Sequence, residues 1–130
     1  MVGDDHRGAQ LRALMRRTFT RGGEVRWAAV TLAEVCRGVA RTRRVESVIA
    51  RRDAGQRIRV VPTDERLAKR VGNILHATRS GSDRLADAHV VALCADADVA
   101  VVITGDPSDI TDLASAIPGT RVVTRRPSLR

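Results

Sequence analysis

Aromatic side chains are nearly absent from this chain of 130 residues, which has no tyrosine, one phenylalanine and one tryptophan. Proteins that bind single-stranded nucleic acid through its bases stack those bases on aromatic rings. Phe19 and Trp27 are too few to build such a surface. The composition therefore argues against a sheet that reads RNA with aromatic side chains.

Cysteine and long apolar runs are also scarce. Cys36 and Cys94 lie among apolar residues and match no zinc or redox spacing, which indicates buried free thiols. No uninterrupted apolar run is longer than residues 90–95, and the N-terminal sequence MVGDDHRGAQ has no apolar signal region. We therefore expect neither a membrane span nor a secretory leader, and a cytoplasmic location.

Positive charge is abundant instead. The chain has 23 Lys and Arg residues against 15 Asp and Glu, a net charge of +8, which favours a polyanionic partner such as nucleic acid. Lys69 is the only lysine. The planar guanidinium of arginine suits phosphate, but a GC-rich genome produces the same bias without a functional cause, and both explanations stay open.

Hydrophobic periodicity alternates between helical and extended spacing, which is typical of an α/β domain. The length suits a single domain with its own core. The helical spacing of Leu11, Leu14, Met15, Thr18 and Phe19 predicts an amphipathic helix over residues 5–20. The other predicted elements are strand 24–29, helix 31–50, strand 58–61, helix 64–78, helix 83–95, strand 99–103, helix 107–116 and strand 121–124.

Four acids lie where a predicted helix begins or a strand ends. Glu34 and Asp87 are in the first turns of their helices, whereas Asp106 and Asp109 follow the strand over residues 99–103. In open parallel sheets, ligand sites form beyond the carboxyl ends of the strands. We therefore expect Glu34, Asp87 and Asp106 to converge at one edge of the sheet.

Helix capping is the alternative explanation for three of these acids. Thr31 and Glu34 fit a capping box, in which each side chain bonds the other residue's backbone N–H. Asp106 fits an N-cap before Pro107, with Asp109 at the positive end of the helix dipole.

Capping does not account for Asp87, because Asp83 is already expected to cap that helix. A functional role is therefore favoured for Asp87. His89 is close to it in sequence, but a neutral partner on a helix face explains His89 at least as well as an RNA contact, so we assign it no role.

Three segments, in this order and at these distances, resemble a PIN-domain ribonuclease of the VapC toxin type. They are TLAEVCRG (31–38), DAHVVALCADADVAVVITGDPSDI (87–110) and TRVVT (120–124). The E-V-x-R-G and D-A helix starts, together with the T-x-D-P-x-D strand end, carry a resemblance that covers nearly the whole chain.

The resemblance implies one PIN-like domain over residues 1–130, built as a three-layer α/β/α sandwich with a mostly parallel sheet. It implies Mg2+ or Mn2+ at the carboxyl edge of the sheet and metal-dependent hydrolysis of RNA. Carboxylate oxygens are suitable ligands for such ions. It also implies a cognate antitoxin encoded next to the toxin, and a homodimer.

The resemblance assigns residues to this chemistry. Glu34, Asp87 and Asp106 match the family's catalytic, metal-binding acids, Asp109 matches an additional metal-binding acid, and Thr104 matches a supporting hydroxyl residue. Arginines beside this site would hold the RNA backbone, and the candidates are Arg37, Arg41, Arg43 and Arg44. A solvated helix face is the alternative explanation for these arginines.

The chain departs from the family pattern at its N-terminus, where members have a central strand that ends in the first metal-binding Asp. Residues 1–3 are too short for that strand, and Asp4 and Asp5 match the start of the following helix. We therefore expect an N-terminally shortened chain. Its parallel strand pairs, from residues 24–61 and 99–124, would lack the strand between them.

Two other functional classes stay open. One is a catalytically degenerate PIN-like protein that binds RNA or an antitoxin without cleavage. The other is a doubly wound nucleotide-binding or phosphoacceptor domain, which is weakly supported because neither G-x-G-x-x-G nor G-x-x-x-x-G-K occurs. Metal titration separates the nuclease from the degenerate binder.

Overall fold

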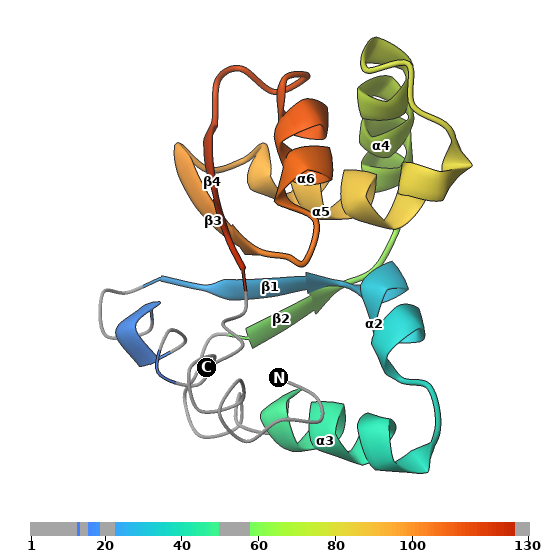
Figure 1. Ribbon diagram of the computed structural model, residues 1–130, viewed down its shortest axis with the longest axis vertical. Coiled ribbons are helices and arrows are strands. Elements are labelled where there is room, and N and C mark those ends of the chain that lie inside the picture. Colours follow the sequence, from blue (N-terminus) through green and yellow to red (C-terminus); the bar gives the residue numbers. More distant parts are fainter. Residues whose placement is uncertain (1–12, 14–15, 19–22, 50–57, 127–130) are drawn as a thin grey trace. The chain divides into compact units, whose positions relative to one another are not determined.

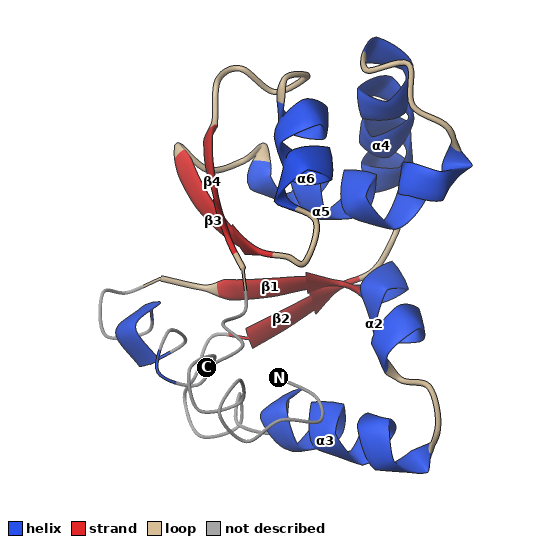
Figure 2. Ribbon diagram, viewed as in Figure 1, coloured by secondary structure: helices blue, strands red, loops and turns tan. Residues whose placement is uncertain are grey.

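The computed structural model describes residues 13, 16–18, 23–49 and 58–126 (Figure 1). The chain divides into two compact units, residues 1–61 with 127–130, and residues 62–126. Each unit combines helices with parallel strands, which confirms the predicted α/β class (Figure 2). None of the helices described is both long enough and apolar enough to cross a membrane.

The first unit contains a parallel pair of strands, β1 (Val25–Ala28) and β2 (Ile58–Val61). In their register, the first residues of the two strands lie side by side, as do the last. Ala28 and Ile58 are almost fully buried, and so is Val45, which lies between the two strands in the sequence. Both strands that the sequence predicts between residues 24 and 61 are confirmed.

The prediction of one continuous helix over residues 31–50 is wrong. The structure has two helices, α2 (Ala29–Val35) and α3 (Val39–Ile49). Helix α2 ends where the N–H of Cys36 donates to the carbonyl of Leu32 at 2.7 Å, and Gly38 then has a φ of 88°. Glycine adopts this left-handed conformation without the strain that a Cβ causes, so the chain changes direction there.

The helix predicted over residues 5–20 lies mostly outside the described residues. Within it, Ala13 and residues 16–18 are helical. Asp4 and Asp5, and the predicted helix end at Ala50, also lie outside the described part of the chain.

The second unit follows the predicted order of elements closely. Its elements are α4 (Glu65–Ala77), the 3-10 turn η2 (Ser82–Arg84), α5 (Leu85–Cys94), β3 (Val99–Ile103), α6 (Pro107–Ala114) and β4 (Arg121–Arg125). Strands β3 and β4 pair in parallel along their whole length. Helix α5 contacts β3 and packs against both α4 and α6, while α6 contacts β4 (Figure 1).

The core of the second unit is centred on α5. Ala88, Val91 and Ala92 of this helix are fully buried, as is Leu113 of α6. Leu67, Val71 and Ile74 of α4 are buried too. Because α5 has neighbours on several sides, its sequence is apolar around most of its circumference rather than along one stripe.

We predict opposite effects of alanine at two glycines. Gly38→Ala should lower the free energy of unfolding by about 1–2 kcal/mol, because alanine is strained at this φ. Gly72→Ala in α4 should raise it by roughly 0.5–1 kcal/mol, because alanine favours a helix interior. An added Cβ would meet no atom within 4 Å at either position. The two glycines therefore offer the same free space for a methyl group and differ only in backbone conformation.

Urea unfolding of the two variants and the parent chain measures the difference. Effects of the same sign would contradict the left-handed conformation at Gly38.

Candidate metal and RNA site

The turn after β3 brings Thr104 and Asp106 together. The Thr104 N–H donates to the carbonyl of Arg125 at 3.0 Å, which extends the pairing of β3 with β4 by one residue. The Asp106 N–H then donates to Oγ1 of Thr104 at 3.0 Å. Thr104 therefore shapes the turn that carries Asp106 at the carboxyl end of β3.

Asp106 occupies the N-cap position of α6, with Pro107 as the first helical residue, as the sequence predicts. Its side chain, however, makes no capping hydrogen bond. Asp106 is exposed, and its carboxylate has no hydrogen bond or ion pair with the part of the chain that the structure describes. Capping therefore does not explain this carboxylate, which is open to a ligand.

Asp64 shows what a capping aspartate looks like in the same unit. Its carboxylate accepts the N–H of Leu67 at 2.8 Å, at the start of α4. Asp64 has the extended backbone that this bond needs, with a ψ of −179°, whereas the ψ of Asp106 is 69°. The backbone conformation after β3 thus prevents Asp106 from capping α6 as Asp64 caps α4.

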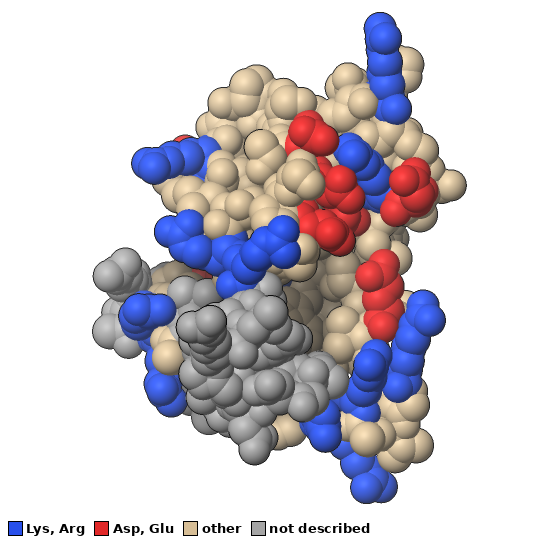
Figure 3. All heavy atoms as spheres, viewed as in Figure 1, with Lys and Arg blue, Asp and Glu red and all other residues tan. Residues whose placement is uncertain are grey.

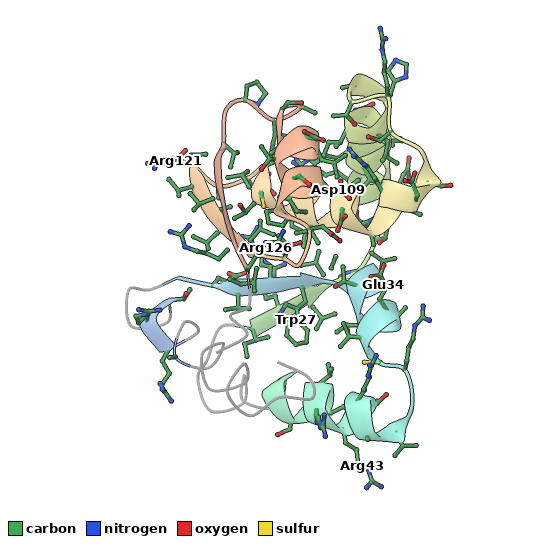
Figure 4. All side chains as sticks on the ribbon, in the orientation of Figure 1. Trp27, Glu34, Arg43, Asp109, Arg121 and Arg126 are labelled. Atoms are coloured by element: carbon green, nitrogen blue, oxygen red, sulfur yellow. The ribbon has the colours of Figure 1, made fainter. Side chains whose placement is uncertain are left out.

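Asp109 is partnered by an arginine. Nη2 of Arg84 donates to Oδ1 of Asp109 at 3.0 Å and lies 3.6 Å from Oδ2 of Asp112. Figure 3 shows acidic side chains grouped on this face of the second unit with a basic side chain among them, and Figure 4 places Asp109 on α6. Asp109 is also in the first turn of α6, where the helix dipole favours an acid.

Asp87 lies in the first turn of α5 and is half-buried. The prediction that Asp83 caps this helix is wrong, because Asp83 belongs to the preceding 3-10 turn and Arg84 holds the N-cap position without a side-chain bond. The dipole of α5 therefore favours an acid at Asp87. This position is compatible with both a structural and a functional carboxylate.

Glu34 is not part of a capping box, which corrects the alternative explanation for this residue. Helix α2 begins at Ala29, and Oγ1 of Thr31 donates to the carbonyl of Ala28 at 2.7 Å. Glu34 is exposed in the last turn of α2 and has no hydrogen bond or ion pair among the described residues (Figure 4). The negative end of the helix dipole disfavours an acid there, so helix stability does not explain Glu34.

Four exposed arginines lie on the connection after α2 and on α3. They are Arg37, Arg41, Arg43 and Arg44, and none has an ion-pair partner within the described residues. Figure 4 shows Arg43 projecting from α3. Arg26 and Arg59, in contrast, both contact Oε1 of Glu24, at 2.9 and 3.4 Å. The arginines of α3 thus keep their guanidinium donors available for an external anion.

His89 and the two cysteines are not assigned to the candidate site. His89 is buried, and its Nδ1 lies 2.8 Å from the carbonyl of Leu85, one turn earlier in α5. The prediction of free thiols is confirmed, with Cys94 buried and Cys36 only partly so.

The carboxylate oxygens of the candidate acids are suitable ligands for a hard divalent cation. Mg2+ prefers oxygen ligands and binds through one or two carboxylates, several waters and substrate phosphates. Among the described residues, no group of three or more His, Cys, Asp and Glu side chains is gathered closely enough to hold a metal. Glu34 belongs to the first unit and Asp87 and Asp106 to the second, so their convergence stays a prediction.

One family model matches the chain, that of the PIN domain, over residues 1–114. The matched range includes all four acids and all four arginines described above. No curated protein and no solved structure matches the chain.

We predict that alanine distinguishes the two N-cap aspartates. Asp64→Ala should lower the free energy of unfolding by about 1 kcal/mol, because it removes the bond to Leu67. Asp106→Ala should change it by less than about 0.5 kcal/mol, because no such bond exists. Urea unfolding in a chelator measures both, and a loss at Asp106 equal to that at Asp64 would show that its carboxylate does cap α6.

Proposed function

The chain belongs to the PIN-domain family, and on this ground we propose that it is a metal-dependent endoribonuclease, the toxin of a toxin–antitoxin pair. PIN domains are typically nucleases, generally use divalent metal ions and commonly bind RNA. The observation that carries the proposal is the carboxylate of Asp106, which is exposed at the carboxyl end of β3 without a partner among the described residues.

Glu34, Asp87 and Asp106 are the proposed ligands of Mg2+ or Mn2+. When bound, such an ion activates a water molecule and neutralises charge on the scissile phosphate. Asp106 contributes a carboxylate that no capping bond withdraws, and Thr104 holds the backbone of Asp106 in place. The exposed position of Glu34 in the last turn of α2 supports its inclusion, because the helix itself gains nothing from an acid there.

The arginines on and before α3 are the proposed contacts to the RNA backbone. Their guanidinium groups are exposed and without internal partners in the described part of the chain. Contacts to phosphate supply affinity without sequence selection. A cognate antitoxin, a homodimer and a cytoplasmic site of action complete the proposal, and their support is the resemblance of the 31–38 and 87–110 segments to VapC toxins.

We predict that the three proposed ligands are each required for cleavage. Glu34→Gln, Asp87→Asn and Asp106→Asn should each lower the rate of Mg2+-dependent RNA cleavage by about 100-fold, because each removes a charged ligand. Asp83→Asn is the matched control, since Asp83 is an exposed acid of the turn before α5, and it should retain the parent rate.

Cleavage that persists in excess chelator would contradict the metal dependence. If the parent chain binds RNA but cuts it with neither Mg2+ nor Mn2+, the protein is the catalytically degenerate binder instead.

We also predict that arginines of α3, which have no ion-pair partner among the described residues, and the arginines that contact Glu24 differ in RNA binding. Arg43→Gln with Arg44→Gln should weaken binding and reduce the slope of log affinity against log salt by roughly 1.4, about 0.7 per lost phosphate contact. The same changes at Arg26 and Arg59 should leave the slope nearly unchanged, because both guanidinium groups already contact the carboxylate of Glu24. Fluorescence anisotropy of a labelled single-stranded RNA at several salt concentrations measures the slopes, and equal slopes for the two pairs of substitutions would exclude α3 from the RNA interface.

A further inference from the structure

Arg84 joins the N-terminal ends of two neighbouring helices. It is the N-cap residue of α5, and its guanidinium contacts Asp109, the third residue of α6. The two partners are 25 positions apart in the sequence. Asp87 follows Arg84 by one helical turn, and Asp106 precedes Asp109 by one, so the contact links the two turns that carry proposed metal ligands.

We propose that Arg84, and not a metal ion, is the partner of Asp109, and that this positioning pair fixes the start of α5 against the start of α6. Asp106 is then the acid of α6 that meets the metal. The inference rests on the proposed function and deepens it, and it departs from the resemblance, which implies Asp109 as a ligand.

The burial of the pair supports a lasting contact. The side chains of Arg84 and Asp109 are 27% and 35% exposed, whereas those of Lys69 and Glu65, which also pair, are 72% and 83% exposed. Water and salt screen a half-buried pair less than an exposed one. Separating Arg84 from Asp109 would also leave two half-buried charges with poorer solvation.

The acids around Arg84 divide into two kinds. Asp109 and Asp112, one turn apart on α6, both approach the same guanidinium. Asp106, on the same helix, has no ion pair among the described residues. A cation bound to Asp109 would lie beside the positive charge of Arg84 and be repelled by it. Asp106 has no such cation in contact with it among the described residues.

The first test measures the pair without metal. In a chelator, Arg84→Gln and Asp109→Asn should each lower the midpoint of thermal unfolding by about 3–6 °C. The double substitution should lower it by clearly less than the sum, because the second change removes a charge that the first left without its partner. The charge swap, Arg84→Asp with Asp109→Arg, should recover more than half of the loss seen in either charge-reversed single variant. Additive losses and no recovery in the swap would overturn the pair.

The second test measures Mn2+ binding by calorimetry and by the electron paramagnetic resonance of free Mn2+. Asp109→Asn alone should weaken binding, because it removes a negative charge while Arg84 keeps its positive charge, with only the longer contact to Asp112 left to it. Adding Arg84→Gln to it should recover most of the lost affinity, because the local charge is balanced again, and the remaining loss measures the positioning that the pair provides. Asp106→Asn should weaken binding at least about 10-fold, and Arg84→Gln should not rescue it.

If the double variant at Arg84 and Asp109 binds Mn2+ as weakly as Asp109→Asn, then Asp109 is a ligand and the inference is wrong. If the parent chain does not bind Mn2+ at all, the proposed function fails, while unfolding in the chelator still decides whether the pair exists.

Discussion

The burial of α5 is the interaction on which the second unit depends. Ala88, Val91 and Ala92 leave no accessible surface, and their small size lets α4, α6 and β3 approach this helix together. Close packing of this kind tolerates little displacement. It therefore places the first turn of α5 beside the first turn of α6, where Arg84 and Asp109 meet.

Aspartates with similar local sequence signals have different roles in this unit because their surroundings differ. Asp64 caps α4, Asp109 pairs with Arg84, and Asp106 does neither. Each of the first two carboxylates gains a hydrogen bond that stabilises the fold. Asp106 contributes no such bond, and for this reason its carboxylate is the best candidate for chemistry on a ligand.

Gly38 has a comparable organising effect in the first unit. Its left-handed conformation separates α2, which ends just beyond Glu34, from α3, which carries Arg41, Arg43 and Arg44. An acid proposed for metal binding and cations proposed for RNA binding thus lie on different helices. The conformation of one residue decides this, because a Cβ at position 38 would be strained at the observed φ.

The amino-acid sequence alone determined the order of elements and most of their bounds, including β2, α4 and β3, because burial imposes a period on side chains that are close in the chain. It also predicted the α/β class and, through the spacing of its acidic segments, the PIN family. It did not predict the break at Gly38, the absence of a Thr31 cap or the failure of Asp83 to cap α5, since these depend on backbone angles. Only the tertiary structure decided that Asp109 pairs with an arginine, while Asp106 has no partner among the described residues, because the guanidinium that separates their roles comes from a residue 25 positions from Asp109 in the sequence.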